Sequence, residues 1–461
     1  MIVLTATLTV LTFTAVNAQG SLFQCDRPAD NNQGNLIETV IGLDWCLDSD
    51  PLPAVIFEPS PLNIFMLGQA AGGSPVIVDL GYGSYIYGDG TYMTNLFVYE
   101  KECPPMKKGG RKGMNMGKKG MKMGKVASKE KKGRAYGGLD RRGLRKHADG
   151  EEMTCDPDRL GAVLVDAPPN LGPGFGEFIK TFLDSVNADL EAMIVTHEHL
   201  DHMGNGISVM EANPTLTRFI AGARVAETIH TFQTMQYDNP RIQEVMAPSP
   251  NYPPYEFDHI FEVEEEMHFG NQTLLLKELD GHTPGNLLIW HAASQTLTNV
   301  DAPIFPKWSP FFELAIALNV PLAFKLFDEY RKFDYKYFIA GHTTHIGTPE
   351  DVADGEAFMI DIADASYRAL TVVSQDPNSS ANFGRIIGSI NPGAPPNVGN
   401  TWLIMGEYLR QIAMVCVDIV LDSTQNYSGR NWIEELAAVR VTIFSHCETL
   451  ADSLRVELPG F

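Results

Sequence analysis

The sequence predicts an α/β fold with mixed sheets, followed by a mostly helical C-terminal region. Hydrophobic residues make up 44% of the 461 positions, enough for a sizeable core, so global disorder is excluded. Strand and helix patterns alternate after residue 160, and three consecutive strands are expected over residues 273–279, 286–291 and 296–300. Beyond residue 351 apolar side chains recur at helical spacing.

Upstream of these elements, short apolar runs separated by Gly and Pro are typical of strands. The runs lie at residues 63–67, 76–78 and 95–99. One strand ends near Tyr99 and another begins near Gly161, so the simplest topology is a β-hairpin whose turn holds a long insert. Long surface insertions cost little stability because loop entropy grows only logarithmically with length.

Charge divides the chain into an acidic body and one basic segment. The whole chain has 35 basic and 57 acidic side chains, a net charge of −22, which excludes a uniformly basic nucleic-acid binder. Residues 101–150 hold 17 Lys/Arg and 4 Asp/Glu, a net of +13, which leaves 18 and 53 elsewhere, a net of −35. The low-complexity insert 104–154 is therefore expected to be solvated, either without function or as a binder of an anionic surface or polymer. Nucleic acid is not expected, because Tyr136 is its sole aromatic residue.

The first 18 residues look like a secretory signal peptide, which predicts a secreted or secretory-pathway location. An uncharged apolar stretch leads to the small-x-small cleavage pattern Val16-Asn17-Ala18, although no Lys or Arg precedes it. The alternative is an N-terminal core strand. Residues 19–52 are expected to form an N-terminal extension. No transmembrane helix is expected, because this stretch and the apolar run 311–324 are both short.

Six cysteines in an exported chain predict disulfides. Their positions favour the local pairs Cys25–Cys46, Cys103–Cys155 and Cys416–Cys447. Each of the last two would contribute about 4 kcal/mol by the loop-entropy model. Three glycosylation sequons fit the same compartment, at Asn271, Asn378 and Asn426. The alternative is a set of free, buried thiols in a cytosolic protein.

The segment Thr196–Asn205 carries the strongest chemical signal. It follows the apolar strand expected at 192–195, and three of only 12 histidines fall within six positions. His197 and His199 are two residues apart beyond a strand end, so both can face one side. Asp201 and His202 follow on the next turn. Imidazole and carboxylate are zinc ligands, so this turn could aim donors at two adjacent metal ions. The alternative is a polar loop with incidental histidines.

Three further donors also follow expected strands. His282 lies in a Gly/Pro turn, Asp301 ends the strand at 296–300, and His342 ends a strand at 337–339. Taken singly, each is as well explained as a turn or cap residue. Taken together, the donors form two sets with Asp301 between them. The sets are His197, His199 and His282 for one metal, and Asp201, His202 and His342 for the other.

These motifs resemble those of the metallo-β-lactamase-fold hydrolase superfamily. HxHxDH matches residues 197–202, GHTPG matches 281–285, and the bridging Asp and last His match Asp301 and His342. The likeness spans about residues 60–350, within a domain expected at 53–350. It implies a four-layer αβ/βα sandwich with the metals at one edge between two sheets. It also implies a structural role for Asp166. The chain departs from the pattern before Asp301, where Asn299-Val300 replaces the commoner Gly, and residues 351–461 lie outside the common core.

The resemblance implies a hydrolase with two Zn²⁺ ions that share a nucleophilic hydroxide, acting on an ester, lactone, thioester or similar bond of a small molecule. Asp201 and His202 are the expected catalytic residues, Asp201 orienting the nucleophile, and Glu198 should point away. One alternative is a persulfide dioxygenase, which has the same fold and one iron. Flavodiiron proteins, which usually have Glu in place of the second His, are disfavoured. A non-catalytic protein that binds surfaces through its basic insert is the other alternative.

The stretch 230–258 is rich in Pro and aromatic residues and could cover the cleft against an apolar substrate. Packing within the fold or a homodimer surface explains it equally well. His345 either tunes His342 or lies on the surface. The aromatic candidates for this wall are Phe232, Tyr237, Tyr252, Tyr255 and Phe257, with Trp308, Phe311 and Phe312 after Asp301.

Overall fold

The computed structural model describes residues 3–4, 56, 60–70, 75–89, 91–102, 158–169, 174–246, 255–390 and 401–457. Contacts divide the chain into two compact units, residues 1–101 with 159–461, and residues 102–158. All the elements given below belong to the first unit.

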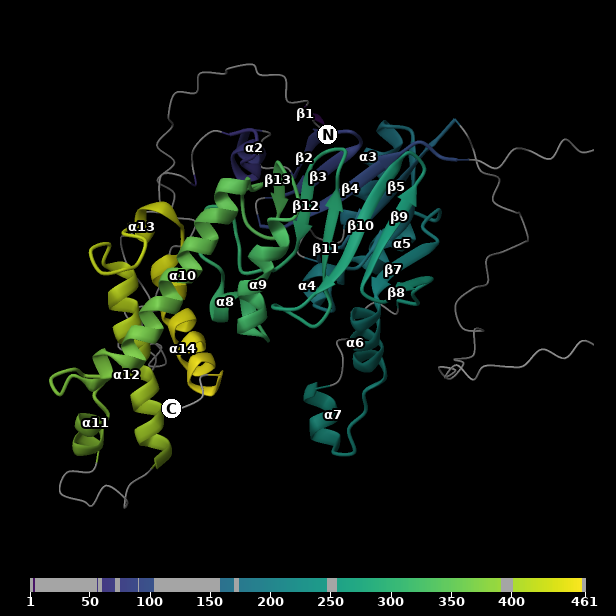
Figure 1. The fold of residues 1–461 in the computed structure, drawn as a ribbon. Helices are drawn as coiled ribbons and strands as arrows, with labels where there is room; N and C mark the ends of the chain where they lie inside the picture. Colours follow the sequence, from purple (N-terminus) through teal and green to yellow (C-terminus); the bar gives the residue numbers. More distant parts are fainter. Residues whose placement is uncertain are drawn as a thin grey trace, which may run out of the picture. The chain divides into compact units, whose positions relative to one another are not determined.

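Eight strands form the first sheet, in the order of the sequence (Figure 1). Neighbouring strands from the second to the fifth are antiparallel, whereas the first pair and the last four strands are parallel, so the sheet is mixed as predicted. The strands are β1 (Val3–Leu4), β2 (Val76–Gly81), β3 (Ser84–Gly88), β4 (Met93–Tyr99), β5 (Leu160–Val165), β6 (Ala188–Ile194), β7 (Arg218–Gly222) and β8 (His259–Phe261).

The expected hairpin around the basic insert is confirmed. Strands β4 and β5 pair antiparallel, in a register that runs from Leu96 opposite Leu164 to Tyr99 opposite Gly161. Beside this base, Lys101 Nζ lies 2.9 Å from Asp189 Oδ2 and 2.8 Å from Glu191 Oε1. The two strands therefore keep their register although about 60 residues separate them in the sequence. The entropic cost of closing such a loop grows only slowly with its length.

Five strands form the second sheet, in the order β13-β12-β11-β10-β9. They are antiparallel except for the parallel pair β12 and β13, and three of them are the consecutive strands predicted from the sequence. The strands are β9 (Glu264–Phe269), β10 (Gln272–Leu279), β11 (Asn286–His291), β12 (Thr296–Asn299) and β13 (Tyr337–Ile339).

Helices lie between and after the strands, and residues beyond 351 are mostly helical, as predicted. The helices before that point are α2 (Ile64–Ala70), α3 (Phe175–Ser185), α4 (Leu200–Met203), α5 (Gly206–Ala212), α6 (Ala223–Thr234), α7 (Pro240–Met246), α8 (Phe312–Ile316) and α9 (Val320–Tyr330). The later helices are α10 (Pro349–Thr371), the 3₁₀ turn η3 (Val373–Gln375), α11 (Phe383–Ile390), α12 (Thr401–Leu421), α13 (Trp432–Glu435) and α14 (Val439–Glu457).

The prediction of a strand at residues 63–67 is wrong, because residues from Ile64 onward form helix α2. The Asn63 side chain accepts a hydrogen bond from the Met66 N–H, three residues on, which favours a helix start. Ile64 and Leu67, also three residues apart, pack into one apolar cluster with Val76 and Ile86. A short apolar run alone does not distinguish a strand from one buried face of a helix.

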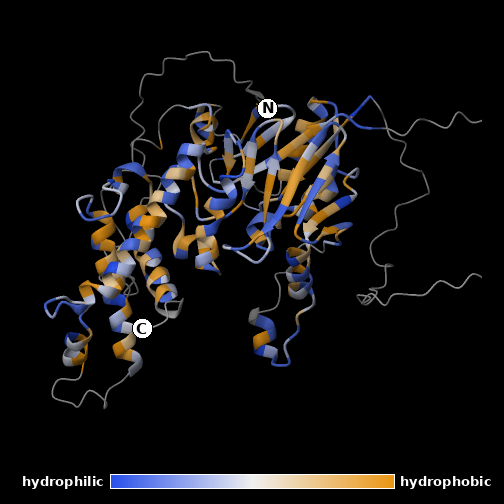
Figure 2. Cartoon of the chain, viewed as in Figure 1, coloured by the Kyte–Doolittle hydropathy of each residue, from blue (hydrophilic) through white to orange (hydrophobic). Residues whose placement is uncertain are grey.

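The two sheets and their helices form four layers, which confirms the predicted sandwich. Side chains of β5 alternate: Ala162 and Leu164 pack with α3 and α6, whereas Val163 and Val165 face the second sheet. On the other side of the second sheet, Leu288 of β11 packs in a cluster with residues of α9, α10, α12 and α14. Figure 2 shows hydrophobic residues along the strands of both sheets.

The C-terminal helices α10, α12 and α14 pack together, and the disulfide Cys416–Cys447 joins α12 to α14, as predicted. The other two predicted pairs lie outside the described residues and stay predictions. The predicted signal peptide also lies outside them apart from Val3 and Leu4, which pair with Ile77 and Val78. Within the described part of the chain, no helix is long and apolar enough to span a membrane.

Candidate metal centre

The predicted ligands gather at one edge of the sandwich because nearly all of them follow a strand at its carboxyl end. His197 lies just beyond β6, His282 beyond β10, Asp301 beyond β12 and His342 beyond β13. His199 is the N-cap residue of α4, whose first turn carries Asp201 and His202. The six-residue motif therefore supplies four donors from one strand end and one short helix.

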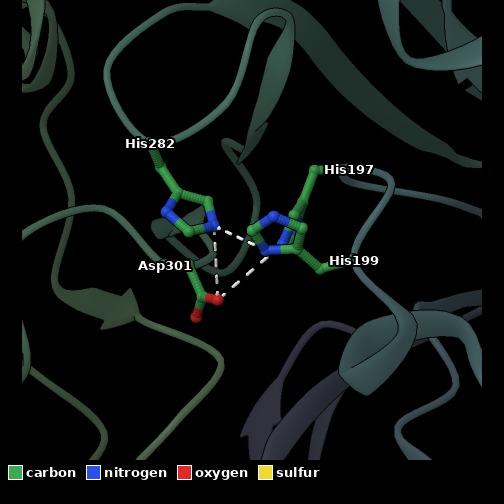
Figure 3. Close-up of side chains that lie close together, drawn as sticks. All are labelled: His197, His199, His282 and Asp301. Atoms are coloured by element: carbon green, nitrogen blue, oxygen red, sulfur yellow. Dashed lines mark hydrogen bonds and ion pairs between the residues drawn. The ribbon is translucent and has the colours of Figure 1, made fainter. Parts of the chain in front are cut away.

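The first donor group comprises His197, His199, His282 and Asp301, whose donor atoms lie within 4.8 Å of one another (Figure 3). His282 Nε2 is 3.0 Å from His199 Nδ1 and 3.6 Å from Asp301 Oδ2, and His197 Nε2 is 3.7 Å from the same oxygen. His197, His282 and Asp301 are buried, so this group is largely closed to solvent.

Hydrogen bonds on the far side of two rings fix which nitrogen can bind a metal. His282 Nδ1 is 2.6 Å from the Ala315 carbonyl oxygen, which only accepts, so Nδ1 carries the proton. Thr196 Oγ1 donates to Asp166 at 2.7 Å, so it accepts from His197 Nδ1 at 3.0 Å. Both rings therefore turn an unprotonated Nε2 towards the group. That of His197 is buried and has no hydrogen-bond partner among the described residues, as expected for a metal ligand.

The second donor group comprises Asp201, His202, His342 and again Asp301. His202 Nε2 is 2.8 Å from His342 Nε2, and the Asp301 carboxylate lies 3.1 Å from each of these nitrogens through a different oxygen. Asp201 Oδ2 is 3.6 Å from His202 Nε2, and its side chain is 41% exposed. Asp301 thus belongs to both groups, and Asp201 is partly exposed to solvent.

The electrostatics of the two groups differ. Burial, reinforced by the neighbouring His202 and His282, holds the pKa of His197 well below its usual value, and burial lowers the pKa of His282 to about 4. For His202, burial opposes protonation but is outweighed by Asp301 and Asp166, so its pKa is raised. The pKa of His342 is raised for the same reason, by Asp301 and Asp201. His197 and His282 of the first group are therefore held neutral, while His202 and His342 of the second face carboxylates that favour positive charge.

Asp166, the strand-end carboxylate, lies behind the second group. Its backbone is left-handed, with φ of 60°, and it accepts the Thr196 N–H at 2.9 Å and the Thr196 hydroxyl at 2.7 Å. Its Oδ2 also faces His202 Nδ1 at 3.5 Å. Thr196 was not singled out from the sequence, although it immediately precedes the motif. Glu198 belongs to neither donor group.

Aromatic side chains line the second group, only partly as predicted. The ring of Phe311 lies 5.6 Å from that of His342, as the sequence suggested, and Tyr92 and Phe305 lie at 4.4 Å and 6.2 Å. Sequence reasoning missed the last two. Tyr92 is brought there by a β-bridge between Tyr92 and His342, which links residues 250 positions apart in the chain.

The other predicted wall residues lie elsewhere. Tyr255 is buried in the core beneath the first sheet, where its hydroxyl donates to the Met203 carbonyl, and Phe257 packs against the same core. For these two the structure favours packing within the fold over a place in the cleft wall, because they fill the space between sheet and helices. Phe232 and Phe312 are exposed, Trp308 donates to Thr344 Oγ1, and Tyr252 lies outside the described residues.

His345, the residue for which the sequence left two alternatives, is not on the surface. It is buried, its Nδ1 lies 2.6 Å from Thr344 Oγ1, and it belongs to neither donor group. Burial lowers its pKa to about 4, so it is a neutral core side chain at neutral pH.

Comparisons with known proteins agree with the motifs. Residues 172–297 match the family model of the metallo-beta-lactamase superfamily. None of the curated proteins searched matches the chain.

Similar solved structures include a beta-lactamase domain protein from Burkholderia ambifaria, with 12% identity, 75% of this chain and 88% of that one covered, and a TM-score of 0.39. A metallo-β-lactamase from Cronobacter sakazakii has 14% identity, covers 62% and 94%, and has a TM-score of 0.36. An archaeal metallo-beta-lactamase superfamily protein from Sulfolobus tokodaii has 15% identity, covers 45% and 78%, and has a TM-score of 0.33. The matched segment 172–297 holds HxHxDH and His282, so the resemblance predicted from the sequence is confirmed over this segment.

Proposed function

We propose that this chain is a hydrolase that holds two zinc ions in the two donor groups. The observation that carries the proposal is the meeting of both groups on Asp301. Its carboxylate lies 3.1 Å from His202 and from His342 of the second group, and 3.6 Å from His282 of the first. Six imidazole and carboxylate side chains around a shared buried carboxylate fit a pair of divalent cations. When bound, such ions supply Lewis acidity and lower the pKa of water towards neutrality.

The side chains divide the remaining work. Burial lowers the pKa values of His197 and His282, so these two are ready to bind a cation without first losing a proton, and His199 completes the set of three imidazoles. Asp201, 41% exposed at the open side, would orient the attacking water and pass a proton to the leaving group. Tyr92, Phe305 and Phe311 present apolar rings beside His342, which suits an ester, lactone or thioester.

Metal analysis of the purified full-length chain tests this proposal, followed by a panel of ester, lactone and thioester substrates. We expect close to two zinc ions per chain and hydrolysis that a chelator abolishes and zinc restores. One iron per chain, with oxygen consumption on persulfide substrates, would instead support the dioxygenase alternative. No bound metal at all would contradict both.

We further propose that the chain is exported and that its basic insert serves as an anchor for anionic surfaces or polymers. The buried disulfide Cys416–Cys447 supports export, since such bonds persist mainly in oxidising compartments. A mature chain that begins at Gln19, and so lacks the two-residue strand β1, is expected on N-terminal sequencing of secreted protein; a chain that begins at Met1 would instead support the alternative of an N-terminal strand. Deleting residues 104–154 should abolish retention on an anionic resin at physiological salt and leave hydrolysis intact. If the deletion leaves retention on the anionic resin unchanged, the insert is not the anchor.

Glycosylation is expected at Asn271 and Asn378 but not at Asn426. Asn426 is buried, and its side-chain nitrogen, where a glycan would be attached, donates to the carbonyls of Val420 and Arg430. The other two asparagines are exposed. Mass spectrometry of the secreted chain before and after glycosidase treatment measures which sites are used.

A further inference from the structure

Helix α8 is a left-handed turn, which is rare for residues other than glycine. The four consecutive residues Glu313, Leu314, Ala315 and Ile316 have φ between 53° and 62°. Each L-residue in this conformation costs about 1–2 kcal/mol. A turn of this kind persists only when the surrounding structure holds it in place.

Helix α14 supplies that hold. Ser445 Oγ accepts the Glu313 N–H at 2.6 Å, and His446 Nδ1 accepts the Leu314 N–H at 3.1 Å. Because an N–H only donates, Nδ1 of His446 is unprotonated, and its Nε2 carries the proton and donates to the Pro310 carbonyl at 2.9 Å. Both nitrogens of this fully buried ring are therefore committed to residues 310–314.

The left-handed turn fixes the orientation of the His282 ring, a proposed metal ligand. The Ala315 carbonyl, within the left-handed turn, accepts from His282 Nδ1 at 2.6 Å. The residues after the turn bond to the backbone on the same side, with Leu318 N–H donating to the His282 carbonyl at 3.1 Å and Asn319 N–H to Gly281 at 3.0 Å. A right-handed turn at 313–316 would aim the Ala315 carbonyl elsewhere and free the ring.

From this chain of contacts we infer that Ser445 and His446 of α14 are positioning residues for the metal centre, which act on His282 through the left-handed turn. The inference rests on the proposed metal site. It gives the C-terminal helices, which lie outside the superfamily match, a part in building the first donor group. The second group draws its main support from other elements, since Asp166, just beyond β5, faces His202 and Tyr92 packs on His342. The second group contacts the segment before the left-handed turn through the Phe311 ring, which lies beside His342.

The test is zinc affinity, measured by calorimetry on the full chain after chelator treatment, in two one-site backgrounds. His342→Ala leaves the first donor group as the complete one, and His199→Ala leaves the second. His446→Phe keeps an aromatic ring of similar size but removes both hydrogen bonds. In the His342→Ala background it should weaken zinc binding about 10- to 100-fold, the usual effect of removing a group that orients a ligand. In the His199→Ala background it should change affinity little.

Two further variants distinguish a positioning role of His446 from a general loss of stability. His446→Asn retains an acceptor near the Nδ1 position, so it should recover part of the affinity. Ser366→Ala removes a different buried hydroxyl of the C-terminal helices, one that lies 3.2 Å from Cys416 Sγ, and should leave zinc binding unchanged. If His446→Phe does not fold, Ser445→Ala removes only the bond to Glu313 and should weaken the first site selectively.

The outcomes are distinct. Unchanged zinc affinity of His446→Phe in the His342→Ala background overturns the inference and leaves the proposed function standing. Equal weakening of both sites, with the same loss in Ser366→Ala, also overturns it. A parent chain that binds no zinc overturns the proposed function, and the inference with it.

Discussion

The two donor groups share Asp301 and differ in almost everything else. The first has three imidazoles, two of them held neutral by burial, whereas the second has two imidazoles facing carboxylates that raise their pKa values. The first group depends on the C-terminal helices through the Ala315 carbonyl, and the second on the first sheet through Asp166. The main supports of the two halves thus differ, although Asp166 also reaches His197 of the first group through Thr196, so a change in one support should affect one half more than the other.

The largest effect is expected from the one residue that the halves share. Asp301→Ala removes a donor from both groups and leaves His202 and His342 facing each other without their carboxylate. Bound zinc should fall from two ions per chain to nearly none, as measured by atomic emission after dialysis. Glu198→Ala is the matched control, because Glu198 lies in the same motif but in neither group, and it should keep nearly all of its metal. A metal-replete Asp301→Ala chain would contradict the shared role.

Removing the disulfide should weaken zinc binding at the first site and not at the second. Replacing Cys416 and Cys447 by serine opens the link between α12 and α14, next to His446. The loop-entropy model gives a loss of about 4 kcal/mol in the free energy of unfolding, which denaturant titration measures. Under conditions where the variant remains folded, zinc affinity should fall at the first site and be retained at the second. Equal losses at both sites would contradict separate supports.

Asp166→Asn probes the other support. It should weaken the second site about 10- to 100-fold, because the carboxylate that faces His202 Nδ1 becomes an amide. The first site should respond less, through Thr196 and His197. Asp189→Asn is the control, since Asp189 pairs with Lys101 and Arg159 away from the donor groups. Calorimetry in the same one-site backgrounds measures both affinities.

The smallest effect concerns acid stability. Burial lowers the pKa of His446 to about 3, whereas in the unfolded chain it stays near 6.5. Below pH 6.5 the unfolded state therefore binds more protons, and the stability that neutral His446 allows is lost progressively as the pH falls towards 3. Between pH 7 and pH 5 this loss is about 2 kcal/mol. His446→Phe lacks this group, so the stability advantage of the parent chain over it should shrink by that amount. An advantage that is constant with pH would contradict the buried neutral ring.

Much of the fold and the gathering of the seven donor side chains could be predicted because their signals are local. HxHxDH places four donors within six positions, and the remaining ligands each follow a recognisable strand. The run at residues 63–67 failed because a short apolar stretch fits a strand and a helix face equally well. For Tyr255 the sequence left core packing and a cleft wall open, because an aromatic residue in a Pro-rich stretch carries no mark of whether it meets solvent, substrate or core.

The residues that hold the ligands in position could not be predicted, because no local sequence pattern marks them. Residues 313–316 are Glu, Leu, Ala and Ile, which favour a right-handed helix, and only tertiary contacts reverse their hand. Those contacts come from Ser445 and His446, more than 130 positions further along the chain. Tyr92 reaches His342 across 250 positions through a single β-bridge. Such pairings depend on how the elements dock, which composition and periodicity do not encode.

The pairing of β4 with β5 has a practical consequence. Tyr99 and Gly161 are direct partners, so the chain leaves and re-enters the sheet at neighbouring points. A foreign domain whose own ends lie close together could be spliced there in place of the native segment, without shifting a single residue of the sheet. This position therefore suits the insertion of a fluorescent protein or an affinity domain. The hydrogen bonds between β4 and β5 already hold the two ends of the insertion site together, so the inserted domain need not do so.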